Sequence, residues 1–191
     1  MSSHGRRAFA RILLLASGLV FTGACANDLP TAREAPKTPG SPHFTLTFDP
    51  NAYYVIRSVG SGLVADVSQA DCCNGAWIHQ WQYGGFSNQQ WRIVDVGGGY
   101  YKILARHSGK AMDVESASFS DAAKVHQWTY QGLANQQWSI AYGTSGYVIT
   151  ARHSGKVLTV SGGGAIGNGA LLKQYGYAGW LSQQWGFEQV P

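Results

Sequence analysis

The triplet Gln89-Gln90-Trp91 decides the fold of this chain, because it occurs twice more, as Gln136-Gln137-Trp138 and Gln183-Gln184-Trp185. Both intervals are 47 residues long. Matches at one fixed interval are the signature of a repeat architecture, in which each copy forms one structural unit. The triplets therefore divide much of the chain into three copies of one unit.

Other segments repeat at the same interval or within one residue of it. His79-Gln80-Trp81 returns as His126-Gln127-Trp128 and, in altered form, as Lys173-Gln174-Tyr175. An Arg-His-Ser-Gly-Lys segment occurs at 106–110 and again at 152–156. We therefore interpret residues 51–191 as three repeats of about 47 residues.

Each repeat has the composition of short strands. The chain holds 25 glycines and 13% aromatic residues but only 13% charged residues, which favours strands joined by tight turns. Residues 100–104, 111–114 and 124–130 are β-branched or aromatic segments bounded by turns. We predict an all-β domain with four strands per repeat and twelve in all. Such units should close around a common threefold axis, which removes exposed sheet edges.

This pattern resembles the ricin B-type lectin family, which is also grouped with the family-13 carbohydrate-binding modules. The three Gln-x-Trp motifs carry the resemblance, which covers about residues 52–188. It implies a β-trefoil, a six-stranded barrel capped by three hairpins, and carbohydrate binding without catalysis. The repeated tryptophans should lie in the shared core, and the first glutamine of each triplet should satisfy backbone groups at a turn.

Sugar recognition needs an aromatic ring for the C–H face of a pyranose, and paired donors and acceptors for its hydroxyls. A carboxylate that accepts from two vicinal hydroxyls adds charge-assisted bonds and orientation. The resemblance assigns an aspartate, a polar residue, an aromatic residue and an asparagine to each sugar site. These are Asp66, His79, Trp81 and Asn88 in the first repeat, and Asp113, His126, Trp128 and Asn135 in the second.

Strand alternation supports this assignment, because it puts His79 and Trp81 on one face. The family often has glutamine where this chain has histidine, and an imidazole would make binding sensitive to pH. The structural alternative places both tryptophans in the core and uses the aspartates to cap turns.

The third repeat departs from the pattern. Thr159 stands in place of the aspartate, Ser182 replaces the asparagine, and only Lys173 and Tyr175 remain as a degenerate third site. We expect this site to be inactive or to bind something different. His107 and His153 occupy equivalent positions before Ser-Gly turns, so we interpret them as turn residues rather than catalytic groups.

The N-terminus has the features of an export signal. Arg6, Arg7 and Arg11 precede an apolar run at 12–21, and Ala24-Cys25-Ala26 offers a cleavage site. We predict a signal peptide at 1–24 and a secreted, extracellular protein. Residues 22–25 also resemble a bacterial lipobox, which would instead anchor the protein through a lipid on Cys25 at the outside of a bacterial cell.

A proline-rich linker is predicted at 25–50, between the signal and the β-trefoil at 51–191. Removal of residues 1–24 takes three of the 14 basic residues, so 11 bases face 10 acids. This balance gives no support for a nucleic-acid partner. Beyond Cys25, the adjacent Cys72 and Cys73 are the remaining cysteines, and their spacing fits no common metal site; they are free thiols or a vicinal disulfide. No cofactor is expected.

Two other functions compete with sugar binding. A glycosidase needs two carboxylates about 5–10 Å apart across one bond, whereas each repeat carries its aspartate singly. A β-trefoil that binds or inhibits another protein is the second alternative, since fold does not fix function. The expected ligand is a polysaccharide or clustered glycan of the galactose, arabinose or xylose type, and a separate glycan-degrading enzyme is a conceivable partner.

Overall fold

Twelve short antiparallel strands make up residues 47–163 and 167–191, the part of the chain that the computed structural model describes. The predicted signal peptide, the lipid anchor at Cys25 and most of the predicted linker lie outside the described residues. Within these residues, no helix has the length and hydropathy that a membrane crossing requires. The described residues, 47–163 and 167–191, belong to one compact unit.

The strands follow one another in groups of four, one group per repeat. The bounds are β1 (Tyr54–Ser58), β2 (Val64–Val67), β3 (Ile78–Trp81), β4 (Trp91–Gly97), β5 (Tyr100–Ala105), β6 (Ala111–Val114), β7 (Val125–Trp128), β8 (Trp138–Tyr142), β9 (Tyr147–Ala151), β10 (Val157–Val160), β11 (Leu172–Tyr175) and β12 (Trp185–Gln189). Short 3-10 turns separate some of them, at η1 (Ser68–Ala70), η2 (Ser87–Gln89), η3 (Glu115–Ala117), η4 (Ala134–Gln136) and η5 (Leu181–Gln183).

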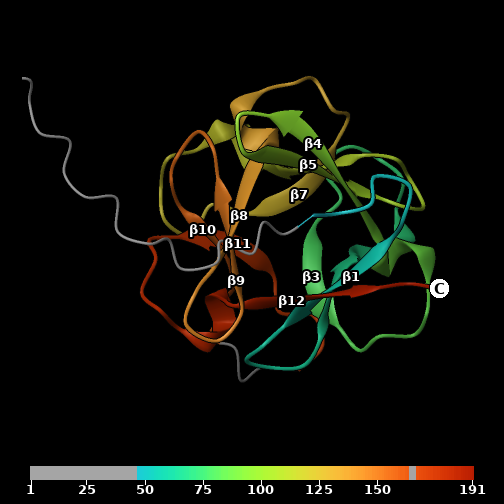
Figure 1. The fold of residues 1–191 in the computed structure, drawn as a ribbon. Coiled ribbons are helices and arrows are strands. Elements are labelled where there is room, and N and C mark those ends of the chain that lie inside the picture. Colours follow the sequence, from blue (N-terminus) through green and yellow to red (C-terminus); the bar gives the residue numbers. More distant parts are fainter. Residues whose placement is uncertain (1–46, 164–166) are drawn as a thin grey trace, which may run out of the picture. The chain divides into compact units, whose positions relative to one another are not determined.

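Six of the strands close into a barrel. β1 pairs with β4, β4 with β5, β5 with β8, β8 with β9, β9 with β12, and β12 returns to β1. Figure 1 shows this last pairing, which brings the first and last strands side by side. The other six strands form the hairpins β2–β3, β6–β7 and β10–β11. The predicted all-β trefoil of three repeats is thereby confirmed.

The tryptophan of each Gln-x-Trp motif lies in the core with no exposed surface. Each indole Nε1 donates a 3.0 Å hydrogen bond to a carbonyl on the second strand of its own repeat. The ring thereby fills the barrel interior while its polar atom is paired, as buried tryptophan requires. The donor–acceptor pairs are Trp91 with Ala65, Trp138 with Met112, and Trp185 with Leu158.

The first glutamine of each motif pairs with the backbone of the preceding loop, as expected. Gln89 accepts a hydrogen bond from the Gly84 amide at 2.8 Å and donates one to the Gln82 carbonyl at 2.9 Å. Gln136 and Gln183 make the equivalent pairs in the other repeats. A buried amide side chain thus holds the turn that leads into the last strand of each repeat.

A second set of glutamines joins neighbouring repeats. Gln127 is fully buried, and its Nε2 donates to the carbonyls of Asp71 at 2.7 Å and Cys73 at 3.0 Å in the first repeat. Gln174 makes the same pair of bonds to the second repeat, and Gln80 reaches the third. The hairpins therefore form one cap rather than three independent units.

The packed domain begins earlier than the predicted linker boundary. Phe48 is 8% exposed and belongs to the core cluster. Its ring meets those of Tyr54, Tyr101 and Phe187 edge-on, with centroids 5.2, 5.6 and 5.0 Å apart. The burial of Phe48 was not predicted from the proline-rich, polar composition of the segment. One aromatic side chain is enough to hold such a segment against the core.

Candidate functional site

The hairpin β2–β3 brings the first two candidate residues together. Asp66 and His79 are direct cross-strand partners, so their side chains lie on the same face. The His79 Nε2 lies 3.0 Å from the Asp66 Oδ1, and the aspartate is only 5% exposed. A carboxylate with this little exposure needs such partners, because burial of an unpaired charge is costly.

Asn88 completes the polar group from the turn η2. Its Nδ2 donates to the Asp66 Oδ1 at 3.0 Å and to the Val67 carbonyl at 2.9 Å. Both side-chain bonds to the aspartate therefore fall on Oδ1. No hydrogen bond to the other oxygen, Oδ2, is made by the side chains of His79 or Asn88.

Trp81 stands beside this polar group at the end of β3. Its ring lies 5.2 Å from the His79 ring at an interplanar angle of 24°, and 42% of the residue is exposed. The structural alternative, a core role for this tryptophan, is wrong because core tryptophans such as Trp91 are 0% exposed. A pocket of about 470 Å³ lies against these residues, and Gln69 and Phe86 also line it.

The second repeat builds the same site. Asp113 Oδ1 lies 3.1 Å from His126 Nε2 and accepts a 3.0 Å hydrogen bond from Asn135 Nδ2. The Trp128 ring stacks 5.5 Å from the His126 ring at 24°, and the tryptophan is 36% exposed. All eight predicted site residues therefore lie in two equivalent clusters, one per repeat.

The second pocket differs from the first at its edges. Its volume is about 490 Å³, and Glu115 and Leu133 line it where the first pocket has Ser68 and Phe86. Gly75 of the first repeat also lines it, so a neighbouring repeat contributes one wall. The second site is therefore richer in carboxylate than the first.

Sequence reasoning missed the rim formed by η1 and η3. Gln69 and Ala70 adopt positive φ angles of 57° and 51°, and the equivalent Ser116 and Ala117 have 55° and 48°. Side chains other than glycine rarely take this conformation, and such strain clusters at binding sites. The signal available in the sequence was the third repeat, which has glycines at the equivalent positions 162 and 163.

The third repeat lacks the polar group. Thr159 is 2% exposed, and its Oγ1 donates to the Val157 carbonyl at 2.9 Å instead of facing a ligand. Ser182 is 1% exposed, and its hydroxyl has no hydrogen-bond partner among the described residues. Lys173 and Tyr175 remain partly exposed at the positions of the histidine and tryptophan. The departure read from the sequence thus removes both the acceptor and the amide of the site.

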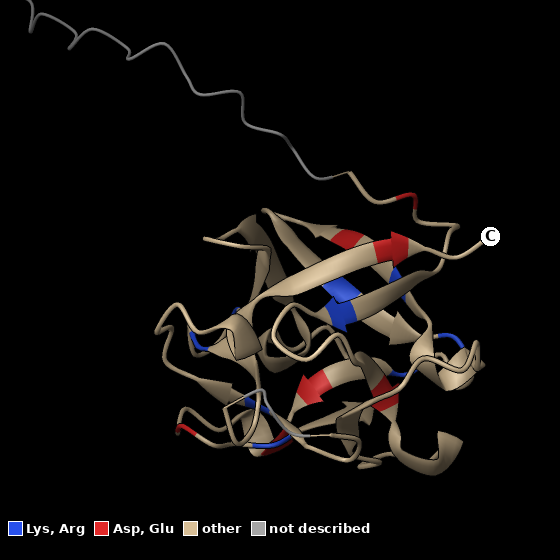
Figure 2. Ribbon diagram, turned by 90° about the horizontal axis from the view of Figure 1, so that it is seen from below, with Lys and Arg blue, Asp and Glu red and all other residues tan. Residues whose placement is uncertain are grey.

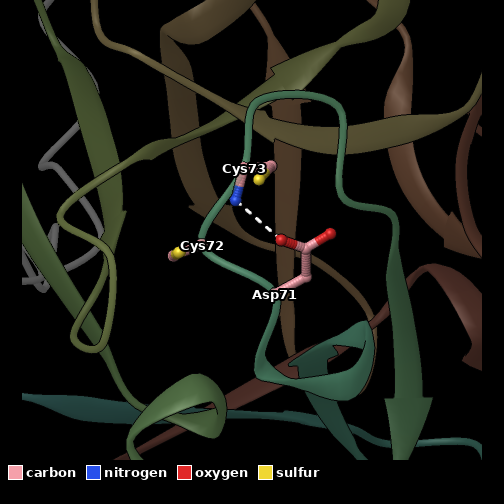
Figure 3. Close-up of side chains that lie close together, drawn as sticks. All are labelled: Asp71, Cys72 and Cys73. Carbon is pink, nitrogen blue, oxygen red and sulfur yellow. Dashed lines mark hydrogen bonds between the residues drawn. The ribbon is translucent and has the colours of Figure 1, made fainter.

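The adjacent cysteines lie in the exposed loop after η1. Cys72 and Cys73 are free thiols, and their sulfurs lie with an Asp71 oxygen within 4.8 Å of one another (Figure 3). The Asp71 carboxylate, which accepts a 2.8 Å hydrogen bond from the Cys73 amide, raises the pKa of the Cys73 thiol. Because the thiolate is the reactive form of cysteine, this interaction lowers the reactivity of Cys73 near neutral pH.

The same loop is tied to the second site. Asn74 Oδ1 accepts a 3.0 Å hydrogen bond from the Thr129 amide, next to the site tryptophan Trp128. His107 Nε2 lies 3.1 Å from the Asp71 carbonyl, and His153 makes the equivalent contact with Ser118. The two histidines therefore secure cap loops, as structural residues would.

The sequence model of the ricin-type beta-trefoil lectin domain-like family matches residues 40–128, 87–175 and 134–190. A designed threefold-symmetric protein, ThreeFoil, is 47% identical, with a TM-score of 0.70 over 72% of this chain and 99% of its own. An exo-β-1,3-galactanase from Clostridium thermocellum is 36% identical, with a TM-score of 0.71 over 75% of this chain.

This chain spans 31% of the galactanase, which is a longer protein. The ricin B-like lectin of Macrolepiota procera, solved in complex with lactose, shares the fold at 20% identity, with a TM-score of 0.66 over 76% of this chain and all of its own. Among curated protein sequences, none matched.

Proposed function

Because the chain belongs to the ricin-type β-trefoil lectin-like family, we propose that it binds carbohydrate, without catalysis, through the pockets of its first and second repeats. One observation carries the proposal: an exposed tryptophan stands beside a buried aspartate that already holds a histidine and an asparagine, and this group occurs twice. A core residue or a turn cap has no need of either feature.

Each group of side chains offers what a pyranose needs. The C–H face of the ring stacks on Trp81 or Trp128, the two site tryptophans that solvent reaches. Two vicinal hydroxyls donate to the free Oδ2 of the aspartate, a charge-assisted interaction that fixes the orientation of the sugar. The histidine and asparagine keep that carboxylate in place before the sugar arrives, so little ordering accompanies binding.

The affinity of one such site is expected to be low. A hexose has about 12 heavy atoms, and roughly −0.3 kcal/mol per atom gives about −4 kcal/mol, which is a millimolar Kd. Two sites on one rigid domain raise the apparent affinity for a long or clustered glycan. The proposed ligands are therefore polysaccharides or glycoconjugates of the galactose, arabinose or xylose type, and the related galactanase is named for a galactan substrate.

The paired sites argue against an enzyme. Glycoside hydrolysis requires two carboxylates about the scissile bond, and the first pocket is lined by one, Asp66. Glu115 adds a second carboxylate only in the second pocket. A hydrolase that used Asp113 and Glu115 would not explain why the first site has the same Asp-His-Asn-Trp group without a second carboxylate. The galactanase shows that this fold also occurs within a longer glycan-acting protein, so a separate enzyme partner is part of the proposal.

Binding of another protein is the second candidate. The third repeat has three large apolar residues on its surface: Trp180 is 55% exposed, Tyr177 50% and Leu181 51%. Exposed apolar side chains of this kind favour a protein partner. This surface lies outside both polar groups, so it does not account for them. Export through the N-terminal signal, with or without a lipid on Cys25, is proposed as the route that brings the sites to extracellular glycans.

A glycan array tests the proposal. The protein, its Trp81→Ala/Trp128→Ala variant and a sample with EDTA are applied to plant, bacterial and animal glycans. We expect binding to a defined glycan set that survives EDTA and disappears in the variant, whose fold is checked by circular dichroism. Silence across the array from folded protein would overturn sugar binding and favour the protein partner.

A further inference from the structure

We propose that the third repeat is an anion-selective site that takes a sugar bearing a carboxylate or a sulfate ester, with the anionic group between Lys124 and Lys173. The inference deepens the proposed function and rests on it, because the ring is still held by the lectin fold. The cap carries one row of three residues for each repeat, and the third row differs in charge from the other two.

Each site belongs to a row of three residues on adjacent cap strands. In the first repeat, Asp66 pairs with His79, and His79 pairs with Leu171 of the third repeat. Partners in antiparallel strands present their side chains on the same face, so all three face the site. The pairings follow from the closure of the hairpins around the axis, which joins each hairpin to the next repeat.

The other two rows have the same geometry and different chemistry. The second row is Asp113, His126 and Trp77, and the third is Thr159, Lys173 and Lys124. The first two rows each have a carboxylate, an imidazole and an apolar side chain. The third row has a hydroxyl and two ammonium groups at the equivalent positions. The formal charge of the row changes from −1 to +2 with neutral histidine, so the third site inverts the polarity of the other two.

Among the residues that the structure describes, neither ammonium group has a carboxylate paired with it. The ion pairs among residues 47–163 and 167–191 join other groups, and neither Lys124 nor Lys173 takes part in one. Lys124 Nζ lies 4.1 Å from the centre of the ring of Trp77, which belongs to the neighbouring second row. Like charges directly opposite each other destabilise a strand pair, and a bound anion removes that repulsion.

Nearby carboxylates do not fill this role. Asp121 Oδ1 is held by Lys156 Nζ at 2.6 Å and by the Gly176 amide at 3.0 Å. Glu115 follows β6 and lines the second pocket, and its backbone amide, not an ion pair, connects it to Lys124. Figure 2 shows how sparse the acidic residues are on the described domain.

The rest of the third site also fits a ligand that brings its own acceptors. Thr159 replaces the aspartate of the other two sites, so no carboxylate stands at this position. Its hydroxyl already donates to the Val157 carbonyl and accepts from Gln183. The buried Ser182 hydroxyl has no partner among the described residues, which leaves a donor without an acceptor at the position of the site asparagine. Tyr175 stands where the other repeats have their stacking tryptophan. A site of donors and one aromatic ring matches an anionic pyranose.

The test compares charged and neutral sugars by NMR titration. The probes are trigalacturonic acid with its methyl ester, and galactose 6-sulfate with galactose, and inorganic sulfate is the control for a free anion. The backbone amides of Lys173 and Tyr175 report on the third site, and the indole signals of Trp81 and Trp128 report on the first two. The variant Lys124→Gln/Lys173→Gln removes both charges. The variant Lys102→Gln/Lys110→Gln, on strand β5 and the following turn, makes the same change of net charge elsewhere.

We expect the charged sugars to bind at Lys173 and Tyr175 at least about tenfold more tightly than their neutral counterparts. That preference should vanish in Lys124→Gln/Lys173→Gln, persist in the matched control, and weaken in high salt. Equal binding of acid and ester, no binding at the third site, or full reproduction of the response by inorganic sulfate would each overturn the inference. If any of these results is found while neutral sugars still bind at Trp81 and Trp128, the inference fails and the proposed function stands. If neutral sugars do not bind at Trp81 and Trp128, that result counts against the proposed function and not against the inference.

Discussion

The substitution Asp113→Asn separates the role of the carboxylate from that of the fold. Asp113 Oδ1 accepts from Asn135 and lies 3.1 Å from the His126 Nε2. An asparagine at this position keeps its own Oδ1 toward those donors, so the nitrogen must occupy the place of Oδ2. The sugar hydroxyls must then reorient and accept from this nitrogen, so neutral hydrogen bonds replace charge-assisted ones.

The expected loss follows from the hydrogen bonds to that oxygen. A bond to a charged acceptor contributes about 1.5–3 kcal/mol, and a neutral one about 0.5–1.5 kcal/mol. Two sugar hydroxyls on Oδ2 therefore lose about 2 kcal/mol together, which is roughly 30-fold in Kd. Starting from a millimolar site, the second repeat of the variant would no longer be saturated at practical sugar concentrations.

NMR titration of the tryptophan indole signals measures this change within one molecule. In Asp113→Asn, the Trp128 signal should cease to titrate, while the Trp81 signal keeps its original Kd because its own aspartate is intact. Thermal unfolding should shift little, since the buried bonds to Asn135 and His126 persist. Wild-type affinity at Trp128 in the folded variant would refute the reasoning that the carboxylate orients the sugar.

Three other predictions concern stability and reactivity. Trp138→Phe leaves a β6 carbonyl unpaired in the core and should lower the free energy of unfolding by about 2–4 kcal/mol in urea denaturation, against a negligible loss if that bond is unimportant. Arg57→Ala breaks the exposed pair with Glu188 that joins β1 to β12, and should cost less than about 1 kcal/mol and be salt-sensitive. Arg57 lowers the pKa of Glu188, so this contribution is present above the unfolded carboxyl pKa and is lost as the pH falls through the folded value; a cost unchanged in acid would contradict it. Asp71→Asn should lower the pKa of Cys73 and speed its alkylation at a fixed pH near neutrality, as followed by mass spectrometry; an unchanged rate would exclude the carboxylate as the cause.

The repeat determined how much of the fold was predictable. A tryptophan that returns at a fixed interval, as Trp91 does, indicates equivalent units, and the resemblance to the ricin B-type lectins then implied the barrel with these tryptophans in its core. The site residues were assigned through the same resemblance, and the repeat supported the assignment because Asp66 and Asn88 have counterparts in the second repeat at the same separation.

What could not be predicted depends on contacts between repeats. Lys124 and Lys173 are distant in sequence and meet only because the hairpins close around the axis. Gly75 lines the second pocket for the same reason, and no local pattern marks either contact. The strained rim at Gln69 was marked only indirectly, by the glycines at 162 and 163 of the third repeat, because its positive φ reflects the geometry of a turn rather than a preference of glutamine.

A crystal structure of the protein soaked with the oligosaccharide that binds best on the array tests the central claim most directly. The account predicts sugar rings stacked on Trp81 and Trp128, with hydroxyls on the Oδ2 atoms of Asp66 and Asp113 and no neutral sugar in the third repeat. Sugar bound elsewhere on the domain, with both tryptophans left in contact with solvent, would contradict it.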